Sequence, residues 1–119
     1  MIAAGRIGLF AFAFLAALPA LAAGDALAGA AKAKEVCAAC HGPDGNKPLA
    51  PDYPKIGGQH YDYLLHSLKA YKAGTRKNAI MSGQTQNLTT RDLENLAAYY
   101  AAQQSTLHVV PLHRLAGDY

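Results

Sequence analysis

The sequence predicts an all-α domain. Two segments, 61–73 and 89–104, carry apolar residues at steps of three and four, which is the spacing of one helix face. A third segment, 25–39, is rich in alanine and predicts a further helix. No segment shows the alternation of apolar and polar residues that marks a strand. These patterns favour helices around one small core.

The first residues predict a signal for export. Arg6 precedes an apolar run over 7–18, and a proline and an Ala-x-Ala pattern follow. A short apolar run that ends in small residues is typical of a cleaved secretory signal peptide. We therefore expect a signal peptide over residues 1–23, cut after Ala22 or Ala23. An uncleaved membrane anchor is the alternative, and the chain is exported in either case.

The first helix of the mature domain is expected over residues 25–39. Gly29 lies inside it, although glycine costs about 1 kcal/mol relative to alanine at such a position. Close approach of another backbone would explain the glycine, and fraying near the terminus is the alternative. The next segment, 42–58, is so dense in glycine and proline that it predicts a long loop.

The second helix is expected over residues 61–73. Its apolar stripe consists of Tyr61, Leu64, Leu65, Leu68 and Tyr71. Gly74 would end it, because glycine readily adopts the left-handed conformation of a C-cap. Residues 75–87 carry no such stripe and are expected to be irregular.

The third helix has a nearly complete start signal. Thr89 can cap its N-terminus, Asp92 stands where a capping box has Glu or Gln, and Leu88 and Leu93 occupy the hydrophobic-staple positions. We expect the helix to end near residues 103–104.

The pentapeptide Cys-Ala-Ala-Cys-His at 37–41 predicts the chemistry. The C-x-x-C-H spacing allows two thiols to add to haem while the adjacent imidazole ligates its iron. Rival interpretations are a redox dithiol and half of a zinc site. A dithiol of the thioredoxin type needs a βαβ context, and structural zinc needs a second Cys or His pair at finger spacing. The sequence has neither, so it predicts one covalent haem c held by Cys37 and Cys40.

The proximal ligand is expected to be His41, bound through Nε2. Its Nδ1–H would then donate to a backbone carbonyl that orients the ring. A proline in the loop is a natural source of that carbonyl, since its backbone is stiff. Pro54 is our first choice and Pro51 the second.

The distal ligand is expected to be Met81. The chain has two methionines, and Met1 is lost with a signal peptide. A methionine that fills a gap in the core is the alternative for Met81. The other candidate ligands are His60, His66, His108 and His113. An iron with both axial positions filled has no open site for a substrate, which favours electron transfer over catalysis.

Basic residues cluster just before Met81. Lys69, Lys72, Arg76 and Lys77 could form a solvated helix end or a docking surface for a redox partner. Arg76 or Lys77 could instead neutralise a haem propionate. The formal net charge of +3 does not indicate a nucleic-acid partner.

The mature domain resembles a class I cytochrome c, and in particular small bacterial cytochromes of the c-553 type and single domains of the two-haem cytochrome c-four group. The matching stretches are CAACHG at 37–42, YPKIGGQ at 53–59, KNAIMSG at 77–83 and LAAYY at 96–100. The resemblance implies thioether bonds at Cys37 and Cys40, axial ligands His41 and Met81, and a bond from His41 to the Pro54 carbonyl.

The resemblance also implies that the first and last helices cross, with Gly29 packed against Leu96 and Tyr99. It spans residues 24–103, which is nearly the whole of the expected cytochrome domain at 24–104. Residues 105–119 continue past the usual end of the fold, and this tail could be disordered, pack on the domain or contact a partner.

The expected function is that of a periplasmic mono-haem electron carrier, and not of an enzyme. Its donor would be a quinol-oxidising complex or a dehydrogenase, and its acceptor a terminal oxidase or reductase. One alternative is an electron-accepting subunit of a periplasmic dehydrogenase complex. A second is a haem gas sensor, which would need Met81 to be displaced easily.

Overall fold

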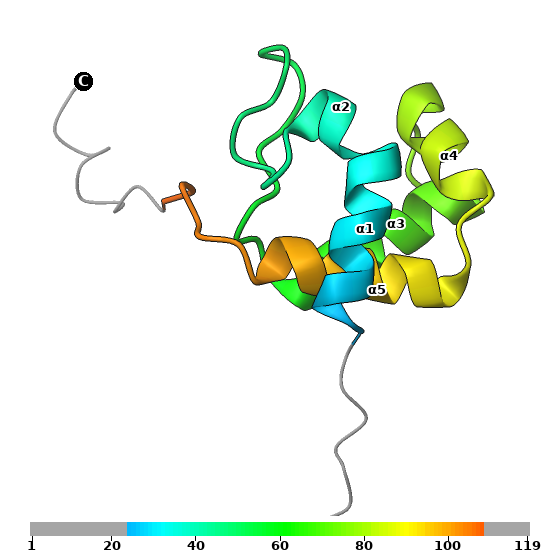
Figure 1. The fold of residues 1–119 in the computed structure, drawn as a ribbon. Coiled ribbons are helices and arrows are strands. Elements are labelled where there is room, and N and C mark those ends of the chain that lie inside the picture. The colour runs from blue at the N-terminus through cyan, green and yellow to red at the C-terminus, as the bar shows by residue number, and fades with distance from the viewer. Residues whose placement is uncertain (1–23, 109–119) are drawn as a thin grey trace, which may run out of the picture.

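Five helices make up the described part of the chain, residues 24–108 of a computed structural model (Figure 1). They are α1 (Ala26–Val36), α2 (Ala38–His41), α3 (Tyr61–Ala73), α4 (Ala79–Gln86) and α5 (Thr90–Ala101). No strand occurs among these residues, so the all-α prediction is confirmed. None of the described helices combines the length and the apolar character needed to cross a membrane.

Helices α1 and α5 cross at the centre of the fold (Figure 1). A Cβ atom on Gly29 would overlap the carbonyl oxygen of Asn95 and lie 2.8 Å from Cβ of Tyr99. The glycine is therefore needed for close approach of two backbones, as predicted. Its nearest neighbours are Asn95 and Tyr99, whereas Leu96 is buried in the core with 1% of its surface exposed.

The core lies beneath this crossing. It gathers one face of α5, one alanine of α1, and single leucines from α3 and the turn before α5. Its buried apolar members are Ala33, Leu64, Leu88, Leu93, Leu96, Ala97 and Tyr100. Both predicted staple residues, Leu88 and Leu93, belong to it, so the start of α5 is anchored in the core.

Helix α3 has the predicted bounds, and Gly74 ends it with a positive φ of 72°. At α5 the Thr89–Asp92 capping box is present as predicted. The helix ends at Ala101, two or three residues earlier than expected. The Gln103 side-chain amide donates to the Tyr99 carbonyl at 2.8 Å and so takes a helix-end acceptor that another turn would need.

The prediction that residues 75–87 are irregular is wrong, because they contain helix α4. The Asn78 side chain caps its start by accepting from the Met81 N–H at 2.9 Å. At its other end the Lys72 ammonium, from α3, donates to the carbonyls of Gln86 and Leu88, both at 2.6 Å. These contacts stabilise both ends of α4, which has no apolar stripe of the kind seen in α3 and α5.

The loop at 42–58 has no regular structure, as predicted, but it is firmly attached. Gly58 N–H donates to the Tyr100 carbonyl at 2.8 Å, and the buried Asn46 amide donates to the Gln104 carbonyl at 2.9 Å. Thr106 donates its hydroxyl proton to Asn46 Oδ1 at 3.0 Å. The first residues of the expected tail thus lie on the domain. The expected signal peptide at 1–23 and residues 109–119 lie outside the described residues.

Candidate functional site

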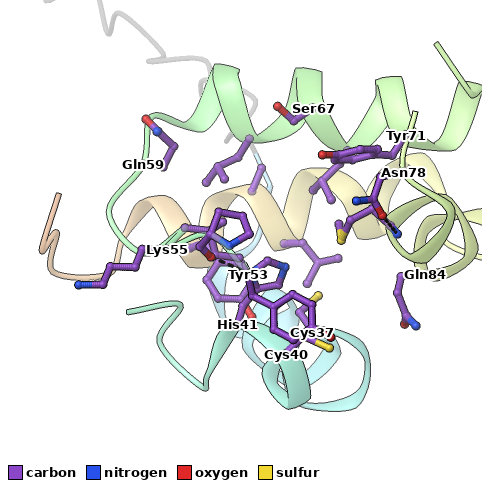
Figure 2. Close-up of a pocket in the computed structure, with 18 of the residues that line it drawn as sticks. Cys37, Cys40, His41, Tyr53, Lys55, Gln59, Ser67, Tyr71, Asn78 and Gln84 are labelled. Carbon is purple, nitrogen blue, oxygen red and sulfur yellow. Dashed lines mark hydrogen bonds between the residues drawn. The ribbon is translucent and has the colours of Figure 1, made fainter. Parts of the chain in front are cut away.

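A cavity of about 400 Å³ opens between the loop and helices α3, α4 and α5 (Figure 2). All four residues that the sequence singled out contribute to its wall: Cys37, Cys40, His41 and Met81. They come from the end of α1, from α2 and from α4, so the fold brings together groups that lie up to forty-four positions apart.

His41 is held in a fixed orientation. It is 6% exposed, and its Nδ1 lies 2.9 Å from the carbonyl oxygen of Pro54, as predicted. Because a carbonyl can only accept, Nδ1 carries a proton, which leaves Nε2 as the nitrogen that can bind a metal. Pro51, the second choice, does not take this role. The ring is therefore in the tautomer that a metal at Nε2 requires.

Cys37 and Cys40 are free thiols, both half-buried. Burial, more than any other cause, raises the pKa of the Cys37 thiol to about 11. At neutral pH Cys37 therefore stays protonated, which makes it a poor nucleophile for disulfide exchange. The described residues contain helices and no strand, so they lack the βαβ context of a thioredoxin-type dithiol.

Tyr100 lines the cavity and brings a phenolic hydroxyl to its wall. The residue is 3% exposed, and its hydroxyl has no hydrogen-bond partner within the described part of the chain. Burial raises the pKa of the phenol far above its usual range. The nearby Cys37 thiol also contributes to this rise, so the buried phenol and the thiol lie at the same part of the cavity wall.

Met81 reaches the cavity from the first turn of α4 and is half-buried. Its neighbour Ile80 is 55% exposed at the same wall. Of the rival ligands, His60, His66 and His108 are exposed and do not line the cavity, and His113 lies outside the described residues. Among the described histidines, His41 alone lines it.

These features fit a haem attached through two thiols. The volume is within the range of about 300–1,000 Å³ that small-molecule and cofactor sites occupy. Apolar side chains such as Val36, Ile56, Leu64, Leu68 and Leu96 make up much of the wall. Two thiols, an oriented imidazole and a thioether are the donor set that a c-type haem uses.

Several polar contacts around the site could not be found by sequence reasoning. Lys72, which the sequence placed in a basic cluster, closes the end of α4. Arg76 donates to Ser67 Oγ at 3.0 Å, and both residues line the cavity. Asn78 offered one local signal, since asparagine is a preferred N-cap residue. The remaining contacts join residues from different elements, which no local pattern reveals.

Comparison with known proteins identifies the family. The cytochrome c family model matches residues 26–102. Cytochrome c4 of Pseudomonas aeruginosa is 50% identical over 86 residues, which are 72% of this chain and 42% of that protein. Cytochrome c-554(548) of Halomonas halodenitrificans is 47% identical over 85 residues, 69% of this chain and 100% of that protein.

The crystal structure of reduced recombinant cytochrome c4 from Pseudomonas stutzeri resembles the fold with a TM-score of 0.66 and 41% identity. The match covers 76% of this chain and 52% of that one. The chain thus spans about half the length of the cytochrome c4 relatives that it matches. It belongs to the cytochrome c family, as a class I member of the cytochrome c4 group that carries one covalently bound haem c.

Proposed function

We propose that this chain is a mono-haem electron carrier of the periplasm, in which Cys37 and Cys40 form the thioether bonds and His41 and Met81 are the axial ligands. The observation that carries the proposal is that these four side chains line one cavity, with His41 Nδ1 already bonded to the Pro54 carbonyl. The bound haem supplies an iron that gains and loses one electron.

The protein residues have distinct tasks in this proposal. The Pro54 carbonyl holds the His41 ring and increases its basicity as a ligand. Met81 supplies a neutral thioether, which raises the reduction potential. The apolar wall excludes water. With both axial positions filled by the protein, no site remains where a substrate could react, so the chain carries electrons and is not itself an enzyme.

The mouth of the cavity is where electrons would pass. Tyr63 and Ile80 line the cavity although they are 51% and 55% exposed. A partner that contacts this mouth comes close to the haem without entering the site. Suitable donors are a quinol-oxidising complex or a dehydrogenase, and suitable acceptors are a terminal oxidase or reductase. Periplasmic location follows from the expected leader over residues 1–23.

Carbon monoxide binding to the reduced holoprotein tests the closed site. At neutral pH the wild-type protein is expected to bind little, because Met81 occupies the distal position. The Met81→Ala variant is expected to bind it readily and serves as the positive control. Rapid binding by the wild type would contradict the carrier proposal and support a gas sensor.

A dedicated subunit of a dehydrogenase is the second candidate. A relative from Thiomonas intermedia, 38% identical over 65 residues (55% of this chain, 30% of that protein), bears the name thiosulfate dehydrogenase electron acceptor. Gel filtration of native extract separates the two candidates. A free carrier elutes at the size of a small monomer, whereas a subunit elutes with its catalytic partner.

A further inference from the structure

The Arg76 side chain lies at the cavity wall, where two contacts hold it in place. Its Nη1 donates to Ser67 Oγ at 3.0 Å, and its guanidinium carbon lies 4.8 Å from the centre of the Tyr71 ring. Ser67 is a nearly buried serine with 9% exposure, and all three residues line the cavity. A hydrogen bond and a cation–π contact together restrict a side chain that is otherwise flexible.

No carboxylate among residues 24–108 forms an ion pair with Arg76. The ion pairs among residues 24–108 join Lys32 to Glu35 and Arg91 to Glu94. The Arg76 guanidinium also acts on the nearby Tyr63 phenol, because it lowers the pKa of that group. An arginine that is fixed in place and faces a ligand cavity without a carboxylate partner is suited to an anionic group of the ligand.

The chemistry of haem indicates where its anionic groups lie. The two propionates are on the edge of the macrocycle opposite the vinyl groups, which become the thioethers. Figure 2 shows Cys37 and Cys40 on one side of the cavity and helix α3, with Ser67 and Tyr71, on the other. A haem attached at the cysteines therefore directs its carboxylates towards the side on which Arg76 is held.

We propose that Arg76 is the counter-ion of a haem propionate and thereby raises the reduction potential of the iron. The inference rests on attachment at Cys37 and Cys40 but not on the role of Met81. A fixed cation beside the propionate offsets its negative charge, so the extra electron of the reduced state is less disfavoured. Ser67 and Tyr71 act as positioning residues, because they hold the guanidinium and do not supply the charge.

Lys77 provides a matched control. It follows Arg76 directly, carries the same charge and is exposed like Arg76, but it does not line the cavity. Arg76→Gln and Lys77→Gln therefore remove one positive charge from nearly the same place in the chain. A general electrostatic effect would change both variants alike, and a propionate pair would change the first alone.

The experiment is protein-film voltammetry of the holoproteins between pH 5 and pH 9. Arg76→Gln is expected to reduce the equilibrium constant for reduction about three- to tenfold, at most about 59 mV for one electron. Its potential should also acquire a pH dependence on the acid side, because an unpaired propionate titrates at higher pH. Arg76→Lys should keep most of the potential, and Ser67→Ala should show a smaller shift than Arg76→Gln.

Equal shifts in Arg76→Gln and Lys77→Gln, or no new pH dependence in Arg76→Gln, would overturn the proposal. The oxidised visible spectrum is recorded on the same samples. A methionine–iron band that persists in Arg76→Gln while the potential stays unchanged refutes the role of Arg76 and leaves the His41/Met81 proposal intact.

Discussion

The two sides of the cavity are built differently. On the His41 side the loop is bonded to α5 through Gly58 and to the chain after α5 through Asn46, and His41 itself is bonded to Pro54. On the Met81 side the short helix α4 packs mainly against α3. One face of the site is thus part of the core structure, and the other is an attached helix.

This difference indicates how firmly each proposed ligand is held. His41 is 6% exposed and cannot leave its place without disrupting the loop. Met81 depends on helix α4, whose ends are held by single side chains, Asn78 and Lys72. Segments with few buried contacts open at low free energy. We therefore expect changes on the Met81 side to alter ligation while the protein stays folded.

The largest expected effect is that of His41→Ala. Loss of this proposed ligand removes the side of the site that is bonded to the loop, so holoprotein should not accumulate. Met81→Ala should still give holoprotein with an altered spectrum. Haem staining of periplasmic extracts measures both. Similar holoprotein yields for the two variants would show that the two sides do not differ.

Substitutions of two glycines compare how tightly the two regions are packed. Gly29→Ala would overlap the Asn95 carbonyl and should lower the free energy of unfolding by about 1–3 kcal/mol. Gly83 lies within α4 with open space around its Cβ position, so Gly83→Ala should stabilise α4, by up to about 1 kcal/mol. Urea denaturation measures both, and a destabilised Gly83→Ala variant would contradict this description of α4.

A pair of asparagines separates global stability from ligation. Asn46→Ala removes a buried amide that bonds Gln104 and Thr106, and should cost about 1–3 kcal/mol of unfolding free energy with an unchanged spectrum. Asn78→Ala removes the cap of α4, costs about 1 kcal/mol, and should weaken the methionine–iron band. A weakened methionine–iron band in Asn46→Ala together with an unchanged band in Asn78→Ala would contradict the comparison.

Lys72 tests the other end of α4. Lys72→Met keeps the aliphatic stem but leaves the carbonyls of Gln86 and Leu88 without their donor. We expect a loss of about 1 kcal/mol of unfolding free energy and a weaker methionine–iron band, because the C-terminal end of α4 loses its donor. Lys69→Met, at an exposed position of the same helix, is the control and should leave the band unchanged.

The smallest effect on ligation is expected from a change at the start of α5, which lies away from both proposed ligands. The Thr89 hydroxyl, followed by its N–H, lowers the pKa of the Asp92 carboxyl. The ionised carboxylate therefore stabilises the fold above its ordinary pKa of about 3.9, and this contribution disappears as the pH falls through the lowered value. Thr89→Ala should cost about 1 kcal/mol at pH 7, less below about pH 4, with no spectral change.

Local signals explain what sequence reasoning achieved. Helices α3 and α5 have complete start or stop signals and apolar stripes, so their type and most of their ends were predictable. Helix α4 was missed because its stability comes from Lys72 on another element and from one capping asparagine. The Ser67–Arg76 and Asn46–Gln104 bonds join distant residues, and only the folded chain shows them.

The visible spectrum of the oxidised holoprotein tests the central claim, ligation by His41 and Met81, most directly. The wild type is expected to show a weak methionine-to-iron band near the red end of the spectrum, and the Met81→Ala variant is expected to lack it. Absence of the band in the wild type, or its persistence in Met81→Ala, would contradict the proposed ligation.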